Sequence, residues 1–310
     1  MSTAILALAH ELPAARAVGP VARPIAAAPG GPSDLALGPA RRALSAAGLE
    51  VGDIDLVMFA TMTPDVTFPG AACFLQHKLG CGTTAALDVR GQCAGFLTAL
   101  MMADAFVSAG QYRHVLLAAG EVHSSGLDYS ERGRAVAELY GDGAAAAVLG
   151  AGNGSVVESI VCHTDGRHYD RFWIEYPSSR QHPLRVTVED LRAGRHYVRI
   201  DREHVAAFAH EHLPAVVRAA LSQAGRAAEN IDAFVLSHVL PEVVEHCAAA
   251  LAIPKARLID AGARHGHLTA AGLPVALSEA VANGRLAPGA RVCVATCGAG
   301  YAWGAAVLRL

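Results

Sequence analysis

AAGLEVGDIDLVMFATMTPD, residues 46–65, repeats its order of residue types in QAGRAAENIDAFVLSHVLPE, residues 223–242. Each stretch begins with a helical pattern that ends at a glycine. An Ile-Asp pair and an apolar segment follow, and the segment ends before a proline. A glycine that stops a helix, followed by an unbroken apolar run, is typical of a helix and then a strand buried on both faces. The pair therefore predicts that one α/β unit occurs twice in the chain.

Two further pairs of segments repeat along the chain. FLTAL at 96–100 resembles HLTAA at 267–271, and each is expected to begin a buried helix of small residues. GDGAAAAVLG at 141–150 resembles GAGYAWGAAVLRL at 298–310, where glycine turns lead into Ala/Val strands of the kind found in sandwiched sheets. The predicted fold class is thus α/β, built from two duplicated halves.

The two halves are placed at residues 1–155 and 156–310. Residues 163–200, which are more polar and aromatic than their surroundings, are inserted before the second helix-strand copy. Functional loops and ordinary surface loops both have this composition. The insertion is therefore expected to be either a lid over a site or a solvated excursion with a β-hairpin.

Composition narrows the range of partners. The 310 residues are 53% hydrophobic and 17% charged, with a formal net charge of −3, so the chain can bury a large core and has no basic surface run for nucleic acid or lipid. The opening lacks the pattern of a signal peptide and no long apolar run is present, so a cytoplasmic protein is expected. Seven cysteines without a CxxC pair indicate neither a disulfide framework nor a zinc knuckle.

Cys93 stands in RGQCAGFLTAL, residues 90–100, after a predicted strand at 87–89 and before a predicted apolar helix at 94–110. At the N-terminus of a helix the free amides and the helix dipole favour an anion, which predicts a lowered thiol pKa and a thiolate nucleophile. The alternative is a structural core thiol, because cysteine is among the most buried residue types.

Four runs together resemble the β-ketoacyl-ACP synthase III branch of the thiolase superfamily: LDVRGQCAGFLTALMMADAFVSAG, ELYGDGAAAAVLG, DAGARHGHLTAAG and CGAGYAWGAAVLRL. The resemblance covers nearly the whole chain and implies a five-layered αβαβα fold, in which each half contributes to one cleft. It implies an acyltransferase in which Cys93 takes the acyl group as a thioester, with an oxyanion hole made by the backbone N–H groups of Cys93 and Ala299.

The same resemblance implies that His238 and His267 complete the catalytic set. His238 matches the histidine of the family's His-Gln-Ala-Asn motif, although the three residues after it differ. His267 stands where the family has an asparagine, after the matching His265 and Gly266. The turn at residues 141–143 is expected to shape the cleft without taking part in chemistry.

These histidines permit two reactions. Neutral imidazoles can donate N–H bonds to an enolate oxygen, which permits decarboxylative condensation with a malonyl-type thioester in fatty acid or polyketide biosynthesis. The departures from the family at His267 and in the N-terminal segment favour specialised metabolism over fatty acid initiation. An imidazole can also act as general base, and with His238 in that role Cys93 would pass the acyl group to an oxygen or nitrogen nucleophile of a small molecule. A third hypothesis, an inactive heterodimer partner, is disfavoured because Cys93 and His238 are intact. A metal site at His265 and His267 has no third ligand at a sensible spacing, so none is expected.

Substrate contacts follow from the resemblance as well. The family's coenzyme A-binding Thr-Arg-Thr-Gly-Ile segment is missing, whereas Arg132 resembles an arginine that meets the nucleotide. The acyl donor is therefore an acyl carrier protein or coenzyme A thioester, with no further cofactor. Phe68 resembles a residue that reaches across a homodimer interface to close the partner's acyl pocket. The alternative is a core aromatic before a helix that starts at proline.

Overall fold

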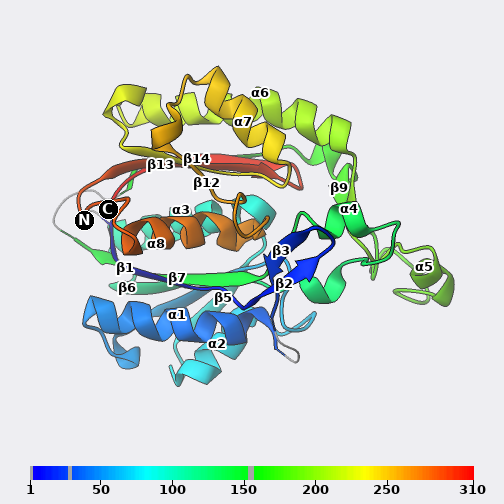
Figure 1. The fold of residues 1–310 in the computed structure, drawn as a ribbon. Coiled ribbons are helices and arrows are strands. Elements are labelled where there is room, and N and C mark those ends of the chain that lie inside the picture. The colour runs from blue at the N-terminus through cyan, green and yellow to red at the C-terminus, as the bar shows by residue number, and fades with distance from the viewer. Residues whose placement is uncertain (1–2, 27–29, 153–156) are drawn as a thin grey trace.

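The computed structural model describes residues 3–26, 30–152 and 157–310. Two five-stranded sheets alternate with three helical layers (Figure 1), which makes the five-layered α/β architecture that the resemblance implies. The helices α3 and α8 lie between the sheets, α1 and α2 cover the outer face of the first sheet, and α6 and α7 cover the outer face of the second. Their bounds are α1 Pro32–Ala47, α2 Ala71–Leu79, α3 Gly95–Ser108, α6 Arg202–Gln223, α7 Pro241–Ala250 and α8 Gly272–Ala282.

The first sheet has the strand order β1-β7-β6-β4-β5. Strand β4 is parallel to β5 and β6, and β7 is antiparallel to both β6 and β1. Their apolar sequences suit a sheet that carries helices on both faces. The strands are β1 Thr3–Glu11, β4 Leu56–Ala60, β5 Ala85–Val89, β6 His114–Glu121 and β7 Gly143–Ala151.

The second sheet has the order β12-β11-β13-β14-β8 and repeats the same pattern of parallel and antiparallel neighbours. Each strand of one sheet therefore has a counterpart in the other, as expected for a duplicated unit. The strands are β8 Val157–Thr164, β11 Ala233–Ser237, β12 Leu258–Asp260, β13 Arg291–Gly298 and β14 Ala302–Arg309.

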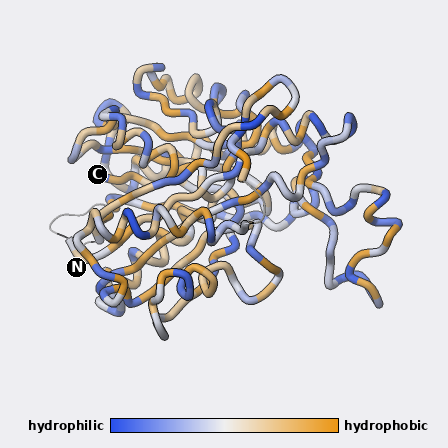
Figure 2. Tube along the Cα trace, turned by 60° about the horizontal axis from the view of Figure 1, so that its bottom comes forward, coloured by the Kyte–Doolittle hydropathy of each residue, from blue (hydrophilic) through white to orange (hydrophobic). Residues whose placement is uncertain are grey.

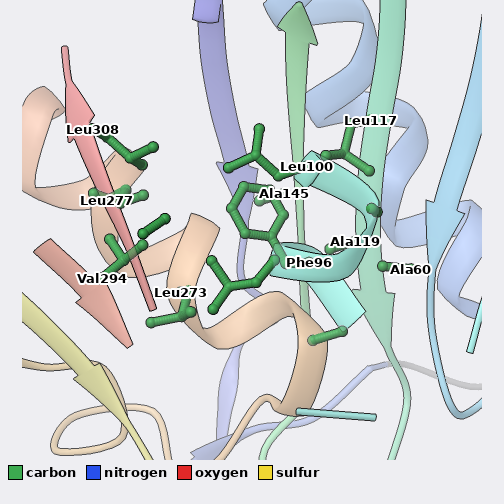
Figure 3. Packing of buried hydrophobic residues seen from close by; sticks show 14 of the residues in the cluster. Ala60, Phe96, Leu100, Leu117, Ala119, Ala145, Leu273, Leu277, Val294 and Leu308 are labelled. Carbon is green, nitrogen blue, oxygen red and sulfur yellow. The ribbon is translucent and has the colours of Figure 1, made fainter. Parts of the chain in front are cut away.

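Hydrophobic packing fills the space between each pair of layers. The central cluster joins α3 and α8 to both sheets, and Figure 3 shows Phe96 and Leu100 of α3 close to Leu273 and Leu277 of α8. Two other clusters join the outer helices to the sheets that they cover. In Figure 2 the segments through the body of the molecule are largely orange, the colour of hydrophobic residues. Because burial of apolar surface contributes about 25 cal/mol per Å², these interlayer contacts hold the two halves together.

The repeated segments FLTAL and HLTAA align in a different register from the one expected. FLTAL and HLTAA are not equivalent positions, because the short 3₁₀ turn η2, Gln92–Ala94, corresponds to η7, Thr269–Ala271. Each turn is followed by a buried helix that begins at glycine, and both Gln92 and Thr269 adopt positive φ angles, 46° and 48°. The matching pair is thus QCAGFLTAL and TAAGLPVAL, in which Cys93 corresponds to Ala270. Shared alanine, leucine and threonine letters had favoured the wrong alignment.

Each sheet is made by one half of the chain. Strand β7 ends the first sheet at Ala151 and β8 begins the second at Val157. The boundary expected between residues 155 and 156 lies outside the described residues.

The remaining elements form the rim of the molecule. Strands β2, Ala15–Val18, and β3, Val21–Pro24, make a hairpin. The insertion contributes a second small antiparallel pair and a short helix that extends away from the body (Figure 1). The other short elements are α4 Arg134–Ala137, β9 Phe172–Trp173, α5 Val188–Arg192 and β10 Arg199–Ile200.

Candidate active site

Cys93 lies in the turn η2, between strand β5 and helix α3 of the first half. Its side chain is buried against the end of strand β13, which belongs to the second half. A Cβ atom at Gly298 would overlap the Cys93 sulfur, so a glycine is needed where the two halves meet. The thiol thus lies at the junction of the halves.

His267 is the imidazole next to the thiol. Its Nε2 atom lies 3.1 Å from the Cys93 Sγ atom. The backbone N–H of His267 donates to the carbonyl oxygen of Leu139 at 2.7 Å, and His267 forms a parallel bridge with Tyr140. These contacts fix the loop before η7 so that His267 reaches the cleft, while His265 is held elsewhere by a 2.9 Å contact between its Nε2 and an oxygen of Glu279.

Two backbone amides lie next to the sulfur. The N–H groups of Ala299 and of Cys93 both act to lower the pKa of the thiol. These are the amides that the resemblance implies for an oxyanion hole. Donors that converge on a nucleophile in this way are also placed to bind the oxygen of a carbonyl that bonds to it.

His238 follows the buried strand β11 and is itself buried. The backbone N–H of Leu240 lies 3.0 Å from its Nδ1 atom. The Leu240 carbonyl oxygen lies 3.3 Å from the same Nδ1 atom. In the shorter contact Nδ1 accepts from the backbone N–H, and that arrangement puts the proton of the neutral ring on Nε2. Within the described residues that Nε2 has no hydrogen-bond partner, so it is a buried donor available to a bound molecule.

The charge state of the thiol differs from the sequence prediction. Burial raises the pKa of Cys93 to about 12, outweighing the lowering effect of its two amide contacts. Burial also lowers the pKa of His238 to about 4 and holds that of His267 well below its usual value. The prediction of a lowered thiol pKa was wrong because it counted the helix terminus and not the desolvation. The resting site contains a neutral thiol beside neutral imidazoles.

Sequence reasoning missed a buried polar group under this site. Glu121 ends strand β6 and accepts hydrogen bonds from Thr61, Thr63 and the backbone of residues 62, 63 and 270. Burial raises its pKa to about 7. Beside it, His123 bonds the Thr269 hydroxyl at 2.7 Å and contacts the ring of Tyr140. The one acidic residue in the run HVLLAAGE was the signal that could have identified this strand end.

The insertion covers the cleft from one side. Cys93 opens into a cavity of about 280 Å³ that is lined by residues of both halves and of the insertion. The insertion contributes Tyr169, Ile174, Val198 and the β9 strand, so its base closes over the thiol, whereas α5 lies away from it. The base of the insertion thus lies where a lid was expected, and α5 lies where a solvated excursion was expected.

The two expected substrate contacts lie outside that cavity. Phe68 is 78% exposed and lies in the loop before α2, which begins at Ala71, so the alternative of a core aromatic is wrong. Arg132 pairs with Asp128 at 2.9 Å and lines a separate small cavity next to Gly194 and Tyr197. Neither side chain lines the cavity that contains Cys93.

A buried carboxylate anchors the turn at residues 141–143. Asp142 is fully buried and accepts hydrogen bonds from the backbone of Ala26 and from the backbone and hydroxyl of Ser124. It thereby ties the β2–β3 hairpin to the loop after β6.

Among residues 3–26, 30–152 and 157–310, no group of three or more His, Cys, Asp or Glu side chains is arranged to hold a metal ion. None of the helices in the same ranges combines the length and the apolar character needed to cross a bilayer.

Comparison with known proteins gives consistent matches. Residues 87–166 match the family model described as 3-oxoacyl-[acyl-carrier-protein] synthase III, and residues 221–310 match the model of its C-terminal region. The chain is 38% identical to the β-ketoacyl-[acyl-carrier-protein] synthase III of Paramagnetospirillum magneticum over 90% of this chain and 84% of that protein.

Solved structures agree with the family models. The 3-oxoacyl-[acyl-carrier-protein] synthase III of Aquifex aeolicus VF5 matches with a TM-score of 0.88 and 26% identity over all of both chains. The priming β-ketosynthase of the R1128 polyketide pathway matches with a TM-score of 0.90 and 26% identity over 100% of this chain and 96% of that one.

Proposed function

Because the chain belongs to the 3-oxoacyl-[acyl-carrier-protein] synthase III family and is therefore an acyl-transferring condensing enzyme, we propose that Cys93 carries the acyl group. It would take this group from a thioester and pass it to a malonyl-type thioester with loss of carbon dioxide. The observation that carries the proposal is the convergence of His267 Nε2 and two backbone amides on one buried sulfur. No cofactor beyond the thioester substrates is proposed.

In the acylation step, the Cys93 sulfur attacks the carbonyl carbon of the donor thioester. Its proton passes to His267, whose neutral Nε2 lies 3.1 Å away, and the carbonyl oxygen becomes an oxyanion held by the amides of Cys93 and Ala299. The oxyanion then collapses, the carbon–sulfur bond to the donor breaks, and the donor thiolate leaves with the proton from His267. A resting thiol with a high pKa is compatible with this order because the proton is lost during attack.

In the condensation step, a malonyl-type thioester loses carbon dioxide and forms an enolate. His238 offers an Nε2–H to the enolate oxygen, since its Nδ1 already accepts from Leu240. Once the sulfur is acylated and the donor thiol has left, the Nε2 atom of His267 is again without a proton, so His238 is the ring that donates in this step. The enolate carbon then attacks the acyl carbonyl, and the Cys93 thiolate leaves and takes a proton from water.

The contact between Leu240 and His238 also bears on the choice between condensation and acyl transfer to a small molecule. Acyl transfer to an alcohol or amine needs a ring nitrogen that accepts a proton, and His238 would have to supply it through Nε2. The tautomer in which Nδ1 accepts from the Leu240 N–H keeps that atom protonated. For His238, this contact therefore favours the role of donor in condensation over the role of base in acyl transfer.

The proposed partners follow from the family and from the surface. We propose an acyl carrier protein or coenzyme A thioester as acyl donor, a role in fatty acid or specialised biosynthesis, and a cytoplasmic location. A homodimer is proposed in which Phe68 contacts the second copy, because a 78% exposed phenylalanine on a loop before a helix is typical of a residue that a protein partner covers.

Product analysis tests the reaction. The purified chain is incubated with an acyl-[acyl-carrier-protein] or acyl-coenzyme A, and then with malonyl-[acyl-carrier-protein] or with a panel of alcohols and amines. One carbon dioxide released per β-keto product is expected, with none from a Cys93→Ala control. An ester or amide formed without carbon dioxide would instead establish transfer to oxygen or nitrogen and overturn the proposal.

A further inference from the structure

A second cavity lies directly beside the one that contains Cys93. It has a volume of about 260 Å³, and Met62, Ile174 and Val198 line both cavities. A cavity of this size suits a small organic group rather than a long chain. Its position makes it the space into which a group attached to Cys93 could extend.

Buried polar side chains converge on this second cavity. His123 and Tyr140 both line it, are both almost fully buried, and have ring centroids 4.7 Å apart. The Nε2 atom of His123 is occupied by the Thr269 hydroxyl at 2.7 Å. In the described ranges, neither the Nδ1 atom of His123 nor the hydroxyl of Tyr140 has a hydrogen-bond partner.

Asp65 adds a carboxylate to the same cavity wall. Its side chain is 9% exposed, and its Oδ1 atom accepts from the Ser33 hydroxyl and lies 4.0 Å from the Lys78 ammonium. Its Oδ2 atom is buried and has no hydrogen-bond partner in the part of the chain that the structure describes. Buried polar atoms in proteins are nearly always paired, so the unpaired Oδ2 atom of Asp65, with the polar rings of His123 and Tyr140 in the same wall, indicates a polar occupant.

The chemistry of the wall decides which polar occupant fits. Asp65 can only accept hydrogen bonds when ionised, and His123 stays neutral because burial lowers its pKa to about 4. No lysine or arginine lines the cavity among the described residues. Among the described residues the wall thus has no cation for an anionic group, and the Asp65 carboxylate is an acceptor for a donor.

We infer that this cavity receives the distal end of the acyl group carried by Cys93, and that this end bears a hydrogen-bond donor, either a hydroxyl or an ammonium group. The inference rests on the proposed acylation of Cys93 and adds the class of acyl group. A plain alkyl chain of the same length would leave the polar atoms of Asp65, His123 and Tyr140 unpaired, and binding sites that hydrogen-bond a substrate group reject analogues that lack it.

Competition between matched acyl thioesters tests the inference. The coenzyme A or carrier-protein thioesters of 6-hydroxyhexanoate, 6-aminohexanoate and heptanoate have chains of equal length and differ in the terminal atom. Loading on Cys93 is followed by intact mass, and kcat/KM by condensation with the malonyl thioester. At least one donor-bearing group is expected to exceed heptanoate by about 10-fold or more in kcat/KM. The hydroxyl and amino arms distinguish a neutral from a cationic terminus.

Variants connect this preference to the cavity wall. Tyr140→Phe and His123→Leu are expected to bring the ratio of donor-bearing to alkyl substrate close to 1, whereas Tyr129→Phe, whose hydroxyl bonds the Ser124 carbonyl outside the cavity, leaves the ratio unchanged. Equal or better use of heptanoate by the unmodified chain would overturn the inference and leave the proposed condensation intact. Failure of every acyl thioester to load would instead overturn the proposed function.

Discussion

The two halves place the same turn at the same point of the fold and use it differently. In the first half η2 presents Cys93, and in the second half η7 presents Ala270. Both turns begin with a residue at positive φ, and both precede a buried helix. Each turn also contacts a strand of the opposite half, β13 for η2 and β6 for η7.

The strand ends that face the turns also correspond. Gly298 ends β13 and leaves room for the Cys93 sulfur, whereas Glu121 ends β6 and bonds the backbone of Ala270. His238, which follows β11, corresponds to Thr61, which follows β4 and donates to Glu121 at 3.2 Å. The first junction, around η2, holds the Cys93 thiol next to a cavity. The second junction, around η7, is filled by the hydrogen-bonded carboxylate of Glu121.

The shared fold therefore supplies the backbone amides of the turn, the N-terminus of the following helix and the burial of the turn in both halves. The choice of side chain at a few equivalent positions then decides which junction can hold a substrate. The second junction thus shows the same backbone arrangement without a thiol.

The largest expected effect comes from a side chain placed at Gly298, which would fill the space around the Cys93 sulfur as Glu121 fills the junction at η7. Gly298→Ala places a methyl group where the Cys93 sulfur lies, so the thiol must move away from His267 and the oxyanion amides. A displacement of about 1 Å from productive geometry can cost about 10²-fold in rate, and kcat/KM is expected to fall by at least that factor. Gly52→Ala, where a Cβ meets no neighbouring atom, serves as the matched control. Unchanged turnover in Gly298→Ala would show that the close approach of the halves is irrelevant to catalysis.

A stability measurement sharpens the comparison, because the first junction holds the buried imidazole of His238 where the second has Thr61. His238 has a pKa of about 4 when folded and an ordinary value of 6.5, so the unfolded chain binds its proton first as the pH falls. Stability from this group is present above pH 6.5 and is lost towards pH 4, by about 3 kcal/mol at 1.36 kcal/mol per pKa unit. Urea unfolding of the unmodified chain and of His238→Asn, each from pH 7 to 4.5, measures the difference. Parallel curves for the two proteins would contradict this account of the buried ring.

The smallest expected effect is electrostatic coupling between the junctions. The charge of Glu121 contributes to the raised pKa of Cys93, so Glu121→Gln is expected to lower that pKa and speed alkylation of the thiol by about two- to five-fold at pH 9. Iodoacetamide labelling followed by peptide mass spectrometry gives the rate at Cys93. Glu279→Gln, which alters the contact with His265 away from the thiol, is the control. Equal rates in all three proteins would mean that the two junctions are electrostatically independent.

The sequence was sufficient to predict what depends on local order. The Gly-Ile-Asp pattern at 46–65 and 223–242 predicted the duplicated α/β unit, and Gly91 and Gly95 around Cys93 predicted a turn before a buried helix. The family resemblance added His267, which the structure brings to 3.1 Å from the sulfur.

Properties that depend on packing could not be predicted in this way. The pKa of Cys93 follows from how completely both halves exclude water, which no local pattern encodes. Glu121, His123 and Tyr140 come from strands and loops distant in sequence from Cys93, so their assembly around the cleft needed the sheet order and register. Shared small residues likewise concealed the correspondence of Cys93 with Ala270 until the two turns were compared.

Mass spectrometry of the acylated protein tests the central claim most directly. The intact chain is exposed to a set of acyl thioesters, including donor-bearing and alkyl members, and is then digested to locate any adduct. One acyl group on Cys93 is expected, with none in Cys93→Ala, whose fold should persist because alanine already occupies the equivalent turn at residue 270. An adduct on another residue, or full condensing activity in Cys93→Ala, would contradict the account.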